Sequence, residues 1–191
     1  MSDTPLPQFI KMLPGFYALE ALLLYVDEPQ RKCCHDFWIA NFERLDRASG
    51  SSHNHQAWVG GYRDHITDAM NIGLFLYNTL SGLGKLPFTV SDALLVIFLH
   101  DIEKLWKDEP RLVDHLKSKV NRKAFRRDKI AEFGFELTEA HWNAINYIEG
   151  EGDDYSNKRR VMNELAAFCH MCDVASARIW HSAPLARDAG P

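Results

Sequence analysis

Polar residues that interrupt apolar helical patterns are the candidates for chemistry in this sequence. His65 falls within a stripe of apolar residues at three- and four-residue spacing, so its imidazole is expected to face the protein interior. His100 and Asp101 directly follow the apolar run of residues 93–99, and Asp173 lies on the inner face of the last expected helix. Two imidazoles and two carboxylates would thus point into the core from three helices.

A metal ion is one explanation for such a group, because a buried, ionised carboxylate is costly unless it pairs with a cation or binds a metal. Taken singly, each position is explained by a histidine with one core hydrogen bond or by a carboxylate paired with an arginine such as Arg178. Taken together, two imidazoles and two carboxylates form a ligand set for a divalent metal that leaves room for water. The combination predicts a metal centre made by His65, His100, Asp101 and Asp173.

Helical periodicity without alternating strand patterns predicts an all-α fold. The length of 191 residues and the hydrophobic content of 46% are typical of a single domain, which we expect to span residues 1–191. The expected helices cover residues 8–26, 29–47, 56–80, 93–99 with a cap at Thr89 or Ser91, 110–134, 138–149 and 158–181. The first two would form an N-terminal extension, about residues 8–47, ahead of a core of about residues 56–181.

Charge and hydropathy exclude some classes of protein. The formal net charge of −4 argues against general binding to nucleic acids or anionic membranes. The apolar stretch at residues 18–26 is shorter than the roughly 20 residues that span a bilayer, and the first seven residues do not resemble a secretory signal. We therefore expect a cytoplasmic protein with no membrane segment. Its four cysteines are expected to be reduced thiols, with a zinc site as the less favoured alternative, drawn from Cys33, Cys34, His35, Cys169 and Cys172.

The order of a histidine, a histidine-aspartate pair and a distant aspartate resembles the HD-domain superfamily of metal-dependent phosphohydrolases. His65, His100-Asp101 and Asp173 match this order, and the segments ALLVIFLHDIEK and CHMCDVASARI look like the family's buried helix before the pair and its final helix. The resemblance covers about residues 56–180. It implies an HD-domain-like helical bundle, here with two extra N-terminal helices, in which the four residues hold manganese, iron, cobalt, nickel or magnesium.

The activity that this resemblance implies is hydrolysis of a phosphate ester, of a nucleotide or a related small molecule, by a metal-activated water. A bound metal lowers the pKa of its water and neutralises a phosphoryl oxygen. Asp101 or Asp173 would orient the water while also binding the metal, and Lys104, one turn beyond His100, would bind the substrate phosphate like the lysine of the family's HDxxK variant. Glu103 departs from that variant, which often has a small residue at this position.

His141 and Glu149 are further candidates for substrate binding, because an apolar stripe directs the imidazole inward and ends at Glu149. His141 and His115 are the histidines available for a second metal, and His141 is favoured because charged residues flank His115. Five histidines have no evident partner set: His35, His53, His55, His170 and His181. One local run of basic residues is expected to be a solvated helix face: Lys117, Lys119, Arg122, Lys123, Arg126, Arg127 and Lys129.

Three alternatives to a small-molecule phosphohydrolase stay open on the sequence alone. A second metal would permit a di-iron oxygenase of the same fold. The basic run would permit a nuclease acting on single strands. A non-catalytic interaction domain would use the metal only to brace the fold.

Overall fold

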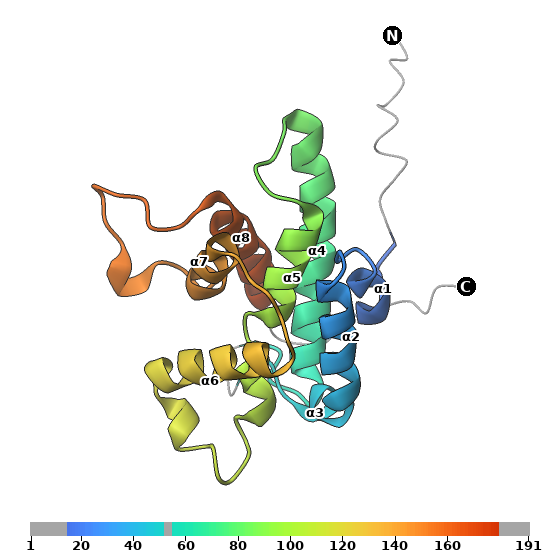
Figure 1. The fold of residues 1–191 in the computed structure, drawn as a ribbon, viewed down its shortest axis with the longest axis vertical. Coiled ribbons are helices and arrows are strands. Elements are labelled where there is room, and N and C mark those ends of the chain that lie inside the picture. Colours follow the sequence, from blue (N-terminus) through green and yellow to red (C-terminus); the bar gives the residue numbers. More distant parts are fainter. Residues whose placement is uncertain (1–14, 52–54, 180–191) are drawn as a thin grey trace.

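A computed structural model of this protein describes residues 15–51 and 55–179. Its helices confirm the all-α prediction (Figure 1). No strand occurs in these residues. The α-helices are α1 (Leu19–Leu23), α2 (Gln30–Ala40), α3 (Phe42–Arg47), α4 (Gly61–Leu83), α5 (Val90–Leu99), α6 (Lys119–Glu132), α7 (Glu139–Tyr147) and α8 (Glu164–Ile179). Short 3₁₀ helices are η2 (Ile102–Trp106), η3 (His115–Lys117) and η4 (Gly152–Asp154). None of the described helices is both long enough and apolar enough to cross a membrane.

Helix α5 lies at the centre of the bundle, packed against α4, α7 and α8 (Figure 1). Its residues from Ala93 to Leu99 are all buried, as expected for a helix that is apolar on every side. A capping box fixes its start, because the Thr89 hydroxyl accepts from the Asp92 N–H at 3.1 Å while the Asp92 carboxylate accepts from the Thr89 N–H at 2.8 Å. The end of α5 then delivers His100 and Asp101 into the middle of the fold.

The N-terminal helices are shorter than predicted. Within the expected helix at residues 8–26, residues 8–14 lie outside the described part of the chain, and helix α1 contains only Leu19–Leu23. The expected helix at residues 29–47 is two helices, because it breaks at Asn41. The Asn41 backbone leaves the helical range, with a φ of −120° and a ψ of 17°, while its side chain adds a second donor to the Phe37 carbonyl at 2.9 Å.

Three later boundaries also differ from the prediction. Helix α4 begins at Gly61 and not at residue 56, because the buried Gln56 has a positive φ of 42°. Residues 110–118 are turns and η3, since side chains of α6 bond the carbonyls of this segment in place of a regular helix. Helix α8 begins at Glu164 and not at residue 158, because the Asn163 side chain accepts from the Ala166 N–H at 2.7 Å and caps it.

Candidate metal centre

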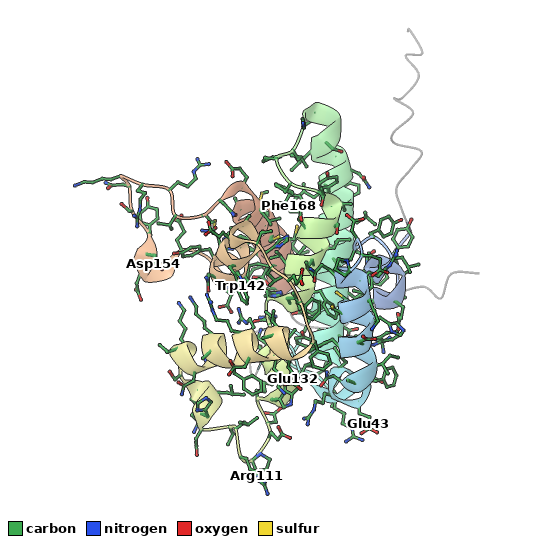
Figure 2. The ribbon with its side chains drawn as sticks, in the orientation of Figure 1. Glu43, Arg111, Glu132, Trp142, Asp154 and Phe168 are labelled. Carbon is green, nitrogen blue, oxygen red and sulfur yellow. The ribbon has the colours of Figure 1, made fainter. Side chains whose placement is uncertain are left out.

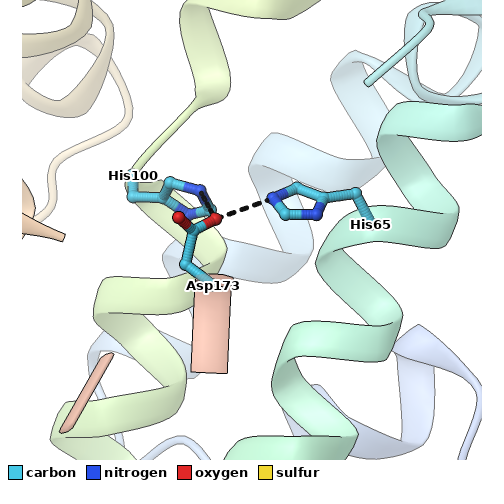
Figure 3. Close-up of side chains that lie close together, drawn as sticks. All are labelled: His65, His100 and Asp173. Carbon is cyan, nitrogen blue, oxygen red and sulfur yellow. Dashed lines mark ion pairs between the residues drawn. The ribbon is translucent and has the colours of Figure 1, made fainter. Parts of the chain in front are cut away.

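Three of the four predicted metal ligands meet where α4, α5 and α8 converge (Figure 3). His65 Nε2 lies 3.1 Å from Asp173 Oδ1, and His100 Nε2 lies 3.4 Å from the same oxygen. Ligands about 2.1 Å from a metal and at right angles to each other are about 3 Å apart. The spacing of these three atoms therefore matches that of neighbouring ligands around one ion.

The ring nitrogens turned away from this point have partners of their own. His100 Nδ1 lies 2.7 Å from the carbonyl oxygen of Ile97, which can only accept, so Nδ1 carries the proton. His65 Nδ1 lies 3.0 Å from Ser176 Oγ, whose own proton goes to the His65 carbonyl. Both rings are thus held with Nε2 toward the carboxylates, the arrangement that partners of metal-ligating histidines usually impose.

Asp101, the fourth predicted ligand, lies beside these three. Its Oδ2 is 3.2 Å from His100 Nε2 and 2.5 Å from Lys104 Nζ. Its Oδ1 is buried and, among the described residues, has no hydrogen-bond partner, and the same is true of His65 Nε2 and His100 Nε2. Buried polar atoms without partners are rare in folded proteins, so their concentration at one point makes it a candidate binding site.

The carboxylates of Asp101 and Asp173 are both ionised, so the site carries two negative charges. Burial would raise the pKa of Asp101, but Lys104, His100 and Arg126 hold it well below its usual range. Burial would likewise raise the pKa of Asp173, and the two imidazoles lower it instead. Burial lowers the pKa of His65. For His100, burial is outweighed by Asp101 and Asp173, which raise its pKa to about 10, so that a proton on His100 supplies the positive charge in the metal-free protein.

Lys104 lies in an ion pair with Asp101, and burial, which would lower its pKa, is outweighed by Asp101, Glu149 and Asp173, which raise it. The ammonium is therefore charged. Lys104 also lines a cavity of about 660 Å³ between η2 and the N-terminal helices, to which Phe42, Arg44 and Arg47 contribute. This volume lies within the range of small-molecule sites.

Arg126 corrects the expectation of a uniformly solvated basic run. The Arg126 side chain is 7% exposed and its guanidinium binds the Glu103 carboxylate through two bonds of 2.6 and 2.8 Å. Arg126 Nη2 also lies 3.9 Å from Asp101 Oδ1. The unusual Glu103, whose side chain is 2% exposed, is thus the partner of a cation that α6 inserts behind the metal centre. The spacing of basic residues along α6 did not distinguish Arg126 from its neighbours. The one signal in the sequence was Glu103, whose carboxylate so close to the histidine-aspartate pair would need a cation.

The structure does not bring His141 to the metal centre. His141 Nε2 is 2.9 Å from Asp92 Oδ1 and so joins the start of α7 to that of α5, while its Nδ1 accepts from the Thr138 N–H at 3.2 Å and caps the start of α7. The second candidate, His115, is exposed near Asn121. Neither histidine belongs to the group formed by His65, His100 and Asp173, and the predicted role of His141 in substrate binding stays a prediction. Glu149 is exposed and acts electrostatically on Lys104 and Arg126, which leaves its predicted role in substrate binding open.

The less favoured zinc site is absent from the described residues. All four cysteines are free thiols, as predicted. Within residues 15–51 and 55–179, the group of side chains that could hold a metal consists of His65, His100 and Asp173 and contains no cysteine. Burial raises the pKa of Cys172 to about 12 and that of Cys169 well above its usual value. These two thiols pack as small apolar side chains in the core.

His55 is the histidine that sequence reasoning missed. Its ring centroid lies 5.0 Å from that of His65, and it is half-buried beside the cluster. The sequence offered no signal for it, because it lies in a loop where spacing does not report direction. Of the other four histidines without a predicted partner, His35 is exposed, His170 bonds the Ile148 carbonyl at 2.6 Å, and His53 and His181 lie outside the described residues.

No protein-family model, curated protein or solved structure gave a significant match to this chain.

Proposed function

We propose that this protein is a metal-dependent phosphohydrolase of the HD-domain type, which hydrolyses a phosphate ester of a nucleotide or a related small molecule. The observation that carries the proposal is the pair of buried Nε2 atoms, on His65 and His100, held 3.1 and 3.4 Å from one carboxylate oxygen of Asp173. In the metal-free protein a proton on His100 offsets part of the negative charge of the carboxylates, and a divalent metal would take its place.

The donor set fits a divalent metal. Two neutral imidazoles and the carboxylates of Asp101 and Asp173 would hold it, and two negative charges are matched to one divalent ion. When bound, the metal would lower the pKa of a water molecule and neutralise charge on a phosphoryl oxygen. Manganese, iron, cobalt, nickel and magnesium all suit a mixed nitrogen and oxygen set, with iron, cobalt and nickel favoured by the two imidazoles.

The chain's own residues supply positioning and charge. The ammonium of Lys104, 19% exposed and next to the 660 Å³ cavity, would attract the substrate phosphate. Asp101 Oδ1, which faces no described hydrogen-bond donor, would accept a hydrogen bond from the attacking water. The water oxygen would bond to phosphorus and lose one proton to solvent, while the ester P–O bond breaks with its electron pair on the alcohol oxygen, which takes a proton from solvent. The cavity between η2 and the N-terminal helices would hold the organic part of a small substrate.

Elemental analysis and a phosphate-release assay test this proposal together. We expect one metal per chain, and release from a restricted set among nucleoside mono-, di- and triphosphates with added manganese. Asp101→Ala should abolish both metal binding and release while the far-UV circular dichroism stays unchanged. Asp128→Ala, which removes an exposed carboxylate of α6, is the matched control and should change neither.

Other outcomes lead to different conclusions. A chain that binds no divalent metal would refute the proposal. One metal without release from any phosphate ester would favour the non-catalytic interaction domain. Two irons and oxygen-dependent turnover would favour an oxygenase, although the structure keeps His115 and His141 away from the centre.

A further inference from the structure

We propose that His55 is a further catalytic residue, whose Nε2 accepts a hydrogen bond from the attacking water and so orients it at the metal centre. The proposal rests on the hydrolytic function proposed above. His55 lies in the loop ahead of α4 and is not one of the four predicted metal ligands.

The position of His55 places it at the edge of the cluster. Its ring is tilted by 55° against that of His65, with the centroids 5.0 Å apart. Lys104, Asp173 and Asp101 all act electrostatically on the His55 ring, so it lies near the charged groups of the candidate site. The group of described residues whose ligand atoms all lie within 4.8 Å of one another contains His65, His100 and Asp173 but not His55.

Gln56 fixes the tautomer of His55. The Gln56 amide nitrogen donates to the carbonyl of Ser176 at 3.0 Å, which identifies the opposite amide atom as the oxygen. That oxygen lies 2.6 Å from His55 Nδ1 and can only accept, so Nδ1 carries the proton. In the neutral ring Nε2 is then the nitrogen that can accept a hydrogen bond.

The backbone around His55 is fixed at several points. The Ser51 hydroxyl lies 2.9 Å from both the N–H and the carbonyl of His55. Gln56 is fully buried with a φ of 42°, a conformation that costs energy in any residue but glycine. Gly61 makes the close approach possible, since a Cβ there would lie 1.9 Å from the Gln56 carbonyl oxygen. Such a conformation persists only where the surroundings enforce it, and here it holds an imidazole beside the His65 ring.

Ser176 links His55 to the metal ligands. Its hydroxyl bonds His65 Nδ1 at 3.0 Å, and its backbone carbonyl accepts from Gln56. One residue of α8 thus orients a metal ligand directly and the His55 ring through Gln56. With Asp101 Oδ1 accepting one hydrogen of the water and His55 Nε2 the other, the water's lone pair is free to attack phosphorus.

Two substitutions separate Nε2 from Nδ1. His55→Asn keeps a nitrogen donor near Nδ1 for Gln56 but removes Nε2, and we expect kcat to fall about 100-fold while KM and the manganese affinity change less than about threefold. His55→Gln returns a polar atom near the Nε2 position and should recover part of the loss. His35→Asn, at an exposed histidine, is the control and should behave like the wild type. Full activity of His55→Asn, or loss of manganese binding in it, would overturn the assignment.

Nuclear magnetic resonance of ¹⁵N-histidine protein tests the inference independently of turnover. The His55 signals, assigned by their loss in His55→Asn, should show a proton on Nδ1, and added manganese should broaden the Nε2 signal. A proton on Nε2, or a signal that manganese does not broaden, would refute the role of His55 even if the enzyme hydrolyses phosphate esters. If these signals behave as expected and no ester is cleaved, the proposed hydrolysis fails while the placement of His55 beside the metal is upheld; if the wild type binds no manganese, both proposals fail.

Discussion

Removing Arg126 should destabilise this protein far more than removing an ordinary surface arginine. Arg126→Leu would leave the Glu103 carboxylate, whose side chain is 2% exposed, without the two bonds at 2.6 and 2.8 Å that now compensate its burial. Breaking a buried ion pair from one side costs about 3–5 kcal/mol. For a chain of this size that corresponds to a fall in Tm of about 6–20 °C.

The assay is urea and thermal unfolding of the metal-free protein followed by circular dichroism. Arg63→Leu is the matched control, because Arg63 also pairs with two carboxylates, Glu20 and Asp46, but its side chain is 31% exposed. It should cost about 1 kcal/mol. The double variant Glu103→Leu with Arg126→Leu should recover to within about 1–2 kcal/mol of the wild type, since both charges are gone. If Arg126→Leu costs no more than Arg63→Leu, the buried pair does not hold the structure as argued.

Three further predictions concern the metal centre itself. Asp173→Asn should lose manganese binding with unchanged helicity, and one manganese per chain in this variant would contradict the ligand set. Lys104→Ala should weaken substrate binding, measured as KM, more than manganese affinity, whereas an equal loss of both would show that the lysine is structural. The pKa of His100 is raised to about 10 in the metal-free protein, so its contribution to stability is complete below about pH 6.5 and is lost as the pH rises through 10. Manganese binding at pH 8 should therefore release about one proton. Calorimetry in buffers of different ionisation enthalpy would detect this proton. Proton uptake, or no change in bound protons, would refute the protonation of His100 in the metal-free protein.

The sequence predicted the helices and the inward direction of three ligands because periodicity reports which face of a helix is buried. His65, His100 and Asp173 lie within or directly at the end of regular helices, where spacing fixes direction, and the structure brings them together. The start of α5 was predictable for a similar reason, because the Thr89 cap is a local interaction between residues near in sequence.

Contacts between distant segments could not be predicted in this way. The partner of Glu103 is Arg126, and whether α6 turns that arginine inward depends on how the helix packs against η2. The same holds for His141, whose inward direction was correct but whose partner, Asp92, belongs to the start of another helix. His55 lies in a loop shaped by Gln56 and Gly61, and loops have no period from which a direction could be deduced.

The meeting of α4, α5 and α8 at one point has a consequence for how the protein unfolds. A metal held by His65, His100 and Asp173 would join three segments that are far apart along the chain, and so would close long loops in the way that a covalent cross-link does. Because the unfolded chain does not hold these ligands together, metal binding would raise the free energy of unfolding of the protein. Amide hydrogen exchange should therefore slow along all three helices together when metal is added, so that the supply of the ion sets the lifetime of the folded chain as well as its chemistry.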